Sequence, residues 1–309
     1  MQKEFSKAIK TETFRLGFDF CGIAPAGPFP ELKEYYNKFI GEKKYTGLSY
    51  LEKYASQRLD PSLLMPDIKS VIAVLLNYFP HQIIPVEDNF VITKYAYGQD
   101  HHLVMNEKMN LLRGYLATLD PSCKSRMFID SGPVLEKAWA RRCGVGWQGK
   151  NTLLINKRAG SFFFIGIIFT NLELDHDTPG RNHCGTCTRC LDACPTGALT
   201  GPYQLEPSKC IAYHNIETKG EIPPEIAKNL NNRIFGCDIC QDVCPFNRFS
   251  IPHREPRFNP AEELITLRKS DWLSLKKETF NRIFANSAIK RTGYEKIMGT
   301  ITSLGARDA

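Results

Sequence analysis

The chain has 309 residues, of which 42% are hydrophobic and 11% aromatic, so its composition suits one large domain or two and argues against disorder. Its net charge of +7 fits a polyanionic partner such as RNA, or equally an ordinary basic enzyme. The longest strongly apolar run, residues 162–169, is far shorter than the roughly 20 residues that cross a bilayer, and the N-terminus lacks the apolar segment of a signal peptide, so we expect a cytoplasmic protein without a membrane partner.

Helical and extended patterns alternate along the first part of the chain. Apolar residues at helical spacing predict a helix within residues 1–20. A continuous apolar run predicts a buried strand at 71–76. From His101 to Leu119 the apolar residues step by three and four, which predicts an amphipathic helix.

A second set of elements follows. Residues 127–129 predict a short strand that leads to Asp130, and a helix is expected from about Val134 to Cys143. Residues 162–169 predict another buried strand. This alternation predicts an α/β sandwich over residues 1–175.

Composition changes after this region. Residues 175–180 form a polar linker, the cysteines then concentrate, and apolar positions between Leu264 and Leu275 predict helices in the tail. We therefore expect three parts: an α/β domain at 1–175, a cysteine-rich domain at 176–250, and a helical segment at 251–309 that packs on the core.

The cysteines indicate metal rather than disulfides. The chain has eleven, an odd number without an export signal, and eight of them fall between Cys184 and Cys244. Clustered thiols in a reducing compartment are typical of metal sites. We expect Cys21, Cys123 and Cys143, which lie far from the others, to be small buried residues.

Two motifs carry the metal chemistry. Residues 184–195 read CGTCTRCLDACP, the C-x2-C-x2-C-x3-C-P pattern of bacterial two-cluster ferredoxins, in which the fourth cysteine ligates the other cluster. Residues 237–245 read CDICQDVCP, with Ile234 where a leading cysteine is expected, and Cys210 supplies the missing eighth ligand.

The ligand count predicts two 4Fe–4S clusters. We assign cluster one to Cys184, Cys187, Cys190 and Cys244, and cluster two to Cys194, Cys210, Cys237 and Cys240. Paired C-x2-C units also bind zinc, but zinc ribbons need neither the third cysteine of the first motif nor the proline after each last cysteine.

Five segments resemble the epoxyqueuosine reductase family, in order and along almost the whole chain. They are residues 95–102 (YAYGQDHH), 128–137 (FIDSGPVLEK), 144–154 (GVGWQGKNTLL), 210–217 (CIAYHNIE) and 235–245 (FGCDICQDVCP). The resemblance implies reduction of epoxyqueuosine to queuosine at the wobble position of tRNAs with GUN anticodons. It also implies cobalamin as second cofactor, a fold akin to reductive dehalogenases, and a low-potential electron donor; we expect a monomer.

The chain departs from the family pattern in three places. Asp100-His101-His102 stands where the family commonly reads Asp-Tyr-His, and Lys137 stands where arginine is usual. Longer members also carry C-terminal helical repeats that help to hold tRNA, which we do not expect in this chain.

Asp130 is the expected proton donor. It follows a predicted buried strand, so we expect burial to raise its pKa and keep it protonated near neutral pH. It also matches the family's proton donor. The alternative is an Asp that caps the following helix.

The other expected cofactor contacts are polar or glycine residues in the resembling segments and near them. They are Arg58, His102, Trp147, Gly149, Lys150, Asn151, Thr152, Ser161, Gln241 and Asp242. Two other functions remain open from the residues alone: a cobalamin-dependent reductive dehalogenase acting on small molecules, and a non-catalytic electron-transfer module.

Overall fold

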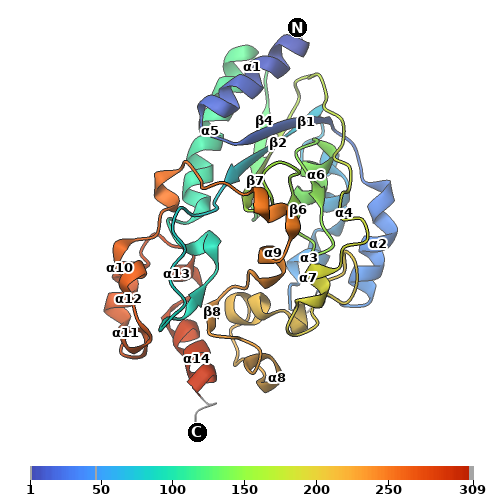
Figure 1. The fold of residues 1–309 in the computed structure, drawn as a ribbon. Helices are drawn as coiled ribbons and strands as arrows, with labels where there is room; N and C mark the ends of the chain where they lie inside the picture. The colour runs from blue at the N-terminus through green and yellow to red at the C-terminus, as the bar shows by residue number, and fades with distance from the viewer. Residues whose placement is uncertain (1, 46, 306–309) are drawn as a thin grey trace.

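The computed structural model describes residues 2–45 and 47–305, and Figure 1 shows the arrangement of its elements. A four-stranded sheet in the order β1-β2-β7-β4 organises the first part of the chain, and each neighbouring pair is antiparallel. Its strands are β1 (Phe20–Pro25), β2 (Ser70–Asn77), β4 (Ser125–Phe128) and β7 (Phe163–Thr170). The three strands predicted from sequence are confirmed, and β1 is an addition.

Helices cover both faces of this sheet, so the predicted sandwich is confirmed. Along β2, Ile72, Val74 and Leu76 pack with α1 (Gln2–Arg15) and α5 (His101–Leu119) on one face. The alternate residues Val71, Ala73 and Leu75 pack with α6 (Glu136–Arg142) on the other. Successive strand residues point to opposite faces, and a strand buried on both reads as a continuous apolar run.

One glycine brings α5 close to the sheet. Gly166 pairs with Val74 in the sheet, and a Cβ at Gly166 would collide with the Met109 side chain from α5. The absence of a side chain therefore sets the distance between the helix and the central strands. The remaining helices of this region are α2 (Pro30–Gly41), α3 (Tyr50–Lys53) and α4 (Ala55–Leu59).

The cysteine-rich region contains little regular structure. Two short helices, α7 (Arg189–Asp192) and α9 (Ile239–Asp242), pack against each other, each within one cysteine motif. The other short elements are β3 (Val91–Ile92), which pairs in parallel with β8 (Arg233–Phe235), the hairpin of β5 (Trp147–Gln148) and β6 (Leu154–Ile155), and α8 (Pro224–Ala227).

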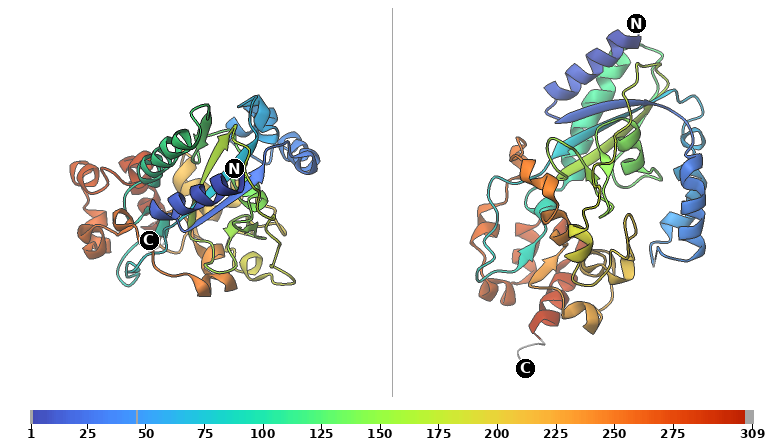
Figure 2. Two further views of the ribbon diagram at one scale, coloured as in Figure 1. Left: turned by 90° about the horizontal axis from the view of Figure 1, so that it is seen from above. Right: turned by 45° about the vertical axis from the view of Figure 1, so that its right-hand side comes forward.

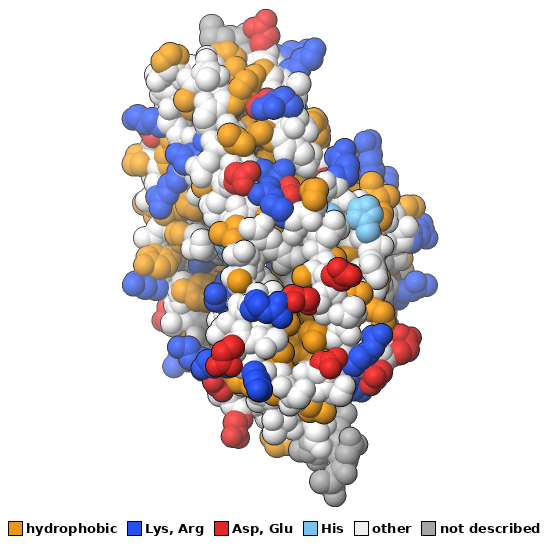
Figure 3. Space-filling view, turned by 90° about the vertical axis from the view of Figure 1, so that its left-hand side faces the viewer, with side chains coloured by type: hydrophobic (Ala, Val, Ile, Leu, Met, Phe, Trp, Pro, Cys, Tyr) orange, Lys and Arg blue, Asp and Glu red, His pale blue; other side chains and the backbone are white. Residues whose placement is uncertain are grey.

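The tail is helical, as predicted. It contains α10 (Glu262–Thr266), α11 (Lys269–Leu273), α12 (Lys277–Ile283), α13 (Ile289–Thr292) and α14 (Tyr294–Gly305). Their apolar core, with Trp272, Phe280 and Phe284, also includes buried residues from segments 84–97 and 211–235. Figure 3 views this side of the molecule, where acidic and basic side chains are interspersed.

The sheet and the cysteine-rich region occupy different parts of the molecule. In Figure 2, α1, α5 and the sheet lie at one end, and the cysteine-rich region and the C-terminal helices lie at the other. Among the described residues, no helix is both long enough and apolar enough to cross a membrane.

Candidate cluster sites and active site

Four thiols line one cavity of about 260 Å³. They are Cys184, Cys187, Cys190 and Cys244. Three come from the first motif and the fourth from the end of the second, which is the set predicted for cluster one. A cavity lined by four thiols, at ligand spacing that ferredoxins use, fits a cubane cluster.

The remaining four cysteines of the region are also mutual neighbours. Burial raises the pKa of Cys240, and the nearby negative charges of Cys237, Cys210 and Cys194 raise it further. Cys190 contributes to the same shift, so the two sets of thiols adjoin. A thiol with a raised pKa keeps its proton until a metal displaces it, as happens when cysteine ligands bind a metal.

Backbone amides also prepare the second set for negative charge. Burial alone would raise the pKa of Cys194, but hydrogen bonds from the backbone at Leu199, Thr196 and Ala198 lower it below its ordinary value. Amides that point at sulfur are a usual means of tuning iron–sulfur clusters. The second set, like the first, therefore fits a thiolate-bound cluster.

The segment between β5 and β6 holds the two cysteine motifs together. Lys150 Nζ donates hydrogen bonds to the carbonyls of Gly185 (2.7 Å) and Cys187 (2.9 Å). Asn151 Nδ2 donates to the carbonyl of Cys240 (3.0 Å), and Trp147 Nε1 donates to Cys184 Sγ (3.5 Å). Three expected cofactor contacts thus lie against the cluster loops.

Two further expected contacts belong to this segment. A Cβ at Gly149 would collide with the side chains of Ile155 and Asn151, so glycine permits their close approach. Thr152 has a φ of 66°, in the left-handed region that few non-glycine residues adopt. Gly149 precedes Lys150 and Thr152 follows Asn151, the two residues that bond to the cluster loops.

Three further expected contacts form hydrogen bonds that link the second motif to the rest of the fold. Gln241 is buried, and its Nε2 donates to Tyr78 Oη (3.0 Å) and to the carbonyl of Ser161 (3.0 Å). Asp242 accepts a hydrogen bond from Lys94 Nζ (2.7 Å). Ser161, Gln241 and Asp242 therefore connect α9 to β7 and to the residues after β3.

Asp130 lies just after β4, as predicted, but its expected environment is wrong. Its side chain is 64% exposed and accepts a hydrogen bond from His101 Nε2 (3.1 Å). This hydrogen bond lowers the pKa of Asp130, and burial opposes the shift only in part. The predicted rise in pKa is therefore corrected to a decrease, because a partner that favours the charged form outweighs burial.

Asp130 does not cap the following helix. The N-cap position of α6 is Leu135, five residues later. Asp130 instead has a φ of 57°, so its backbone is held in a conformation that favours glycine. Non-glycine residues in this region cluster at functional sites.

A second carboxyl group fixes the Asp130 backbone. The Asp130 N–H donates a hydrogen bond to Glu136 Oε1 (2.6 Å). Burial, reinforced by the charge of Asp130, raises the pKa of Glu136 to about 8. Burial also lowers the pKa of the neighbouring Lys137, which the charge of Cys240 opposes, so this group of charges adjoins the second set of thiols.

Arg58 belongs to the same group of charges. It is buried at the end of α4, and its charge lowers the pKa of Glu136. Its Nε atom has no hydrogen-bond partner among the described residues. A buried guanidinium with a free donor fits a large polar ligand, which is the role expected for Arg58.

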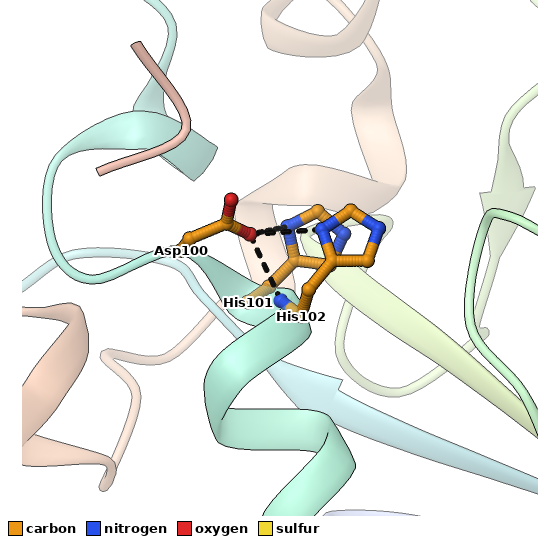
Figure 4. Close-up of side chains that lie close together, drawn as sticks. All are labelled: Asp100, His101 and His102. Atoms are coloured by element: carbon orange, nitrogen blue, oxygen red, sulfur yellow. Dashed lines mark hydrogen bonds and ion pairs between the residues drawn. The ribbon is translucent and has the colours of Figure 1, made fainter. Parts of the chain in front are cut away.

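Figure 4 shows how the two histidine rings lie beside Asp100. Both rings turn an Nδ1 atom toward the Asp100 carboxylate: His102 Nδ1 lies 2.9 Å from Asp100 Oδ1 and His101 Nδ1 lies 3.5 Å from it. His101 is buried and stacks on Phe164, with ring centroids 4.2 Å apart. His101, and not the expected contact His102, has a ring nitrogen within hydrogen-bond distance of Asp130.

The three side chains are close enough to hold a metal ion, since one ligand atom of each lies within 4.8 Å of the others. Their hydrogen bonds describe a helix cap instead. Asp100 Oδ1 accepts from the N–H and Nδ1 of His102, and burial of Asp100 is outweighed by these bonds, which lower its pKa to about 2.

Sequence reasoning missed His101 and Glu136 as site residues. Both sit next to predicted ones, His101 before His102 and Glu136 within the segment that follows Asp130. The signal was the departure of His101 from the family pattern. Glu136 gave no signal, because a glutamate in the first turn of a helix is ordinary.

Comparisons with known proteins find relatives along almost the whole chain. A family model described as "Epoxyqueuosine reductase QueG, DUF1730" matches residues 58–131, and a 4Fe-4S double cluster binding domain matches residues 183–247. A curated epoxyqueuosine reductase of Cellulophaga algicola is 43% identical over 303 residues, which covers 98% of this chain and 99% of the relative.

Solved structures show the same fold. An epoxyqueuosine reductase with an epoxyqueuosine-modified tRNA stem loop is 29% identical, with a TM-score of 0.88 over 98% of this chain and 81% of that one. A Bacillus subtilis epoxyqueuosine reductase with its catalytic aspartate loop swung out of the active site has the same identity, TM-score and coverage. A reductive dehalogenase studied for B12-dependent dehalogenation shares the fold at 15% identity and a TM-score of 0.54, over 99% of this chain and 36% of that one.

Proposed function

The chain belongs to the epoxyqueuosine reductase family, and from this premise we propose how its residues divide the work of reducing epoxyqueuosine to queuosine in tRNA. The cofactors are two 4Fe–4S clusters and cobalamin. Conversion of the epoxide to an alkene takes up two electrons and two protons and releases water. When bound, the cofactors supply the electrons and a low-valent cobalt nucleophile.

The cysteines hold the clusters as two interlocked sets. Cluster one takes Cys184, Cys187, Cys190 and Cys244, the four thiols of one cavity. Cluster two takes Cys194, Cys210, Cys237 and Cys240, whose charges act on one another. Lys150 and Asn151 hold the two cysteine motifs next to each other through hydrogen bonds to the carbonyls of Cys187 and Cys240.

Asp130 donates the proton to the departing oxygen. The loop that carries it follows β4, and Glu136 holds its backbone so that the carboxyl group is exposed to a ligand. The single observation that carries the proposal is the hydrogen bond from the Asp130 N–H to Glu136 Oε1, which holds the exposed Asp130 carboxyl group in the loop after β4. The electrostatic influence of Cys240 on Lys137, the residue after Glu136, indicates that the second set of thiols lies near this loop.

Arg58 and His102 belong to the part of the site around Asp130 and hold cobalamin through polar contacts. Trp147, Gly149, Lys150, Asn151 and Thr152 act at the boundary between the cofactor and the clusters, and Ser161, Gln241 and Asp242 act through the second motif. The substrate is the wobble nucleoside of a tRNA with a GUN anticodon, and a low-potential protein donor supplies the electrons.

The test is conversion of the modified nucleoside. Anaerobically reconstituted protein with cobalamin, a chemical reductant and tRNA that contains epoxyqueuosine should form queuosine, measured by nucleoside mass spectrometry. Protein without cobalamin is the control. No conversion by protein that has both clusters and cobalamin would contradict the proposed function. Turnover of haloaromatic compounds in its place would favour the dehalogenase alternative.

A further inference from the structure

His101 is the only described side chain recorded in hydrogen-bond contact with the carboxylate of Asp130. It is 5% exposed, lies in the first turn of α5, and is clamped flat against Phe164 of β7, with an angle of 4° between the rings. Its Nε2 atom lies 3.1 Å from Asp130 Oδ2. The imidazole thus packs on Phe164 while its Nε2 atom lies within hydrogen-bond distance of Asp130.

A carboxylate faces each nitrogen of this ring. Nε2 meets Asp130, and Nδ1, which has no hydrogen-bond partner in the part of the chain that the structure describes, lies 3.5 Å from Asp100 Oδ1. The ionisable groups packed around the ring are Asp100 and His102 from α5, Asp130 from the loop after β4, and Tyr95. Burial raises the pKa of Tyr95, so it stays a neutral phenol. Beyond them, Glu136, Lys137 and Arg58 act on Asp130 or its neighbour.

This geometry leaves the proposed acid without its proton. The His101 hydrogen bond lowers the pKa of Asp130, so the carboxyl group by itself is ionised near neutral pH. An imidazole changes charge between pH 5 and 8 and is the common proton shuttle in proteins. The proton that the reaction needs is therefore held by the pair rather than by the carboxyl group.

We propose that His101 is the proton source behind Asp130, an inference that rests on the proposed function of Asp130. As the epoxide carbon–oxygen bond breaks, the N–H bond at His101 Nε2 breaks and its proton passes to Asp130 Oδ2, and the Asp130 carboxyl group gives a proton to the departing oxygen, where a new O–H bond forms, so that Asp130 ends as the carboxylate it was at the start. His101 is left as a neutral imidazole, which takes a proton from solvent before the next turnover. No electrons move in this step.

The test separates proton supply from positioning. In H101Q an amide can still donate a hydrogen bond to Asp130, but it cannot release a proton. Between pH 6 and 7 the single-turnover rate of the wild-type holoenzyme should depend less steeply on pH than that of H101Q. The H101Q rate should rise about tenfold for each unit of decreasing pH, because Asp130 must then be protonated directly, and at pH 7 it should be lower by a factor on the order of 10² or more.

Three controls accompany this profile. Iron and cobalamin content of H101Q should match wild type, which shows that the site still assembles. H81Q should leave rate and profile unchanged, because His81 contacts His253 through its carbonyl and its ring, and neither residue belongs to the proposed site. H101F, which keeps an aromatic ring on Phe164, should lose as much rate as H101Q.

A second measurement does not depend on turnover. The protein has seven histidines, so a spectrum of holoenzyme with 13C-labelled imidazoles is simple, and the signal missing from H101Q identifies His101. In D130N this signal should titrate at lower pH than in wild type, because the charged form loses its carboxylate partner.

Parallel pH profiles for wild type and H101Q would overturn the proposal, since His101 would then only position Asp130. An unchanged His101 titration in D130N would overturn it as well. Failure of wild-type holoenzyme to reduce epoxyqueuosine would contradict the proposed function instead, and the titration would still report on the pair.

Discussion

Asp130 and Glu136 are carboxyl groups six residues apart whose pKa values shift in opposite directions. A hydrogen bond from His101 lowers the pKa of Asp130, whereas burial raises that of Glu136 to about 8. Enzymes separate the roles of neighbouring carboxyl groups by such differences in environment. Here the Asp130 side chain is exposed, and Glu136 holds the backbone that carries it.

The first prediction at this scale is loss of chemistry in D130N. The side chains are nearly isosteric, so both clusters and cobalamin should stay bound. Turnover should fall by a factor on the order of 10² or more, typical for loss of a positioned acid. Single-turnover nucleoside analysis and iron content measure the two effects. A rate close to wild type would remove Asp130 from the mechanism.

Glu136 predicts a pH-dependent stability. Its folded-state pKa is raised, so its stabilising contribution is complete below its unfolded value of about 4.5 and is lost as pH rises through about 8. Wild-type Tm should therefore fall between pH 5.5 and 8.5 more than that of E136Q. Each kcal/mol corresponds to about 2–4 °C for larger domains.

Thermal unfolding of holoenzyme, followed by circular dichroism at both pH values, measures this difference. E221Q, at an exposed position, is the matched control and should behave as wild type. Equal slopes for wild type and E136Q would show that Glu136 is ionised in the folded protein.

At the scale of elements, the 3-10 turn Lys94–Ala96 after β3 anchors the second cysteine motif from outside it. Lys94 Nζ lies 2.7 Å from Asp242 and 3.5 Å from Asp238, and both Lys94 and Asp238 have side chains less than 15% exposed. Thr93 hydrogen-bonds to Asp238 as well. Asp238 lies between Cys237 and Cys240, so this ion pair holds the loop of cluster two.

K94M should therefore weaken cluster two. Removal of the cation leaves two acidic groups uncompensated in a partly buried place, which is strongly destabilising. Iron content should fall from about eight toward about four atoms per chain. K69M is the control, because its ion pair with Glu173 is exposed. Retention of all iron in K94M would show that the loop holds without Lys94.

The long elements were predictable and their pairing was not. Helix α5 and strands β2 and β7 follow from local apolar patterns. β1 was missed because FCGIAP is short and carries glycine and proline, which are uncommon in strands. The antiparallel order depends on contacts between distant segments, and no local pattern encodes it.

The site divides in the same way. Cysteine spacing predicted the ligands within the two motifs, because ligands for a cubane recur at short intervals, whereas Cys210 was added by ligand count and its assignment stays a prediction. The environment of Asp130 was predicted wrongly because it depends on His101, 29 residues earlier, which the fold brings into contact. The division at residues 175 and 250 stays a prediction, and the tail shares its core with segments 84–97 and 211–235.

At the scale of the whole molecule, the assignment of the cysteines to two sets predicts which cluster is lost when one cysteine is replaced. C210A should lose cluster two and keep cluster one, so iron falls from about eight to about four atoms per chain. C123A, outside both sets, should keep all of it. Iron analysis and low-temperature electron paramagnetic resonance distinguish the two clusters. Full iron in C210A would show that another residue is the eighth ligand.

The exchange of last ligands between the two motifs also sets an order of biogenesis. The sheet is complete once Thr170 has been synthesised, before the first cysteine of either set leaves the ribosome. The cavity lined by Cys184, Cys187 and Cys190 closes only with Cys244, and the other set waits for Cys240. Both sites thus gain their last thiol within four residues of synthesis, so we expect the two clusters to be loaded at the same stage, after the strands of the sheet have been synthesised.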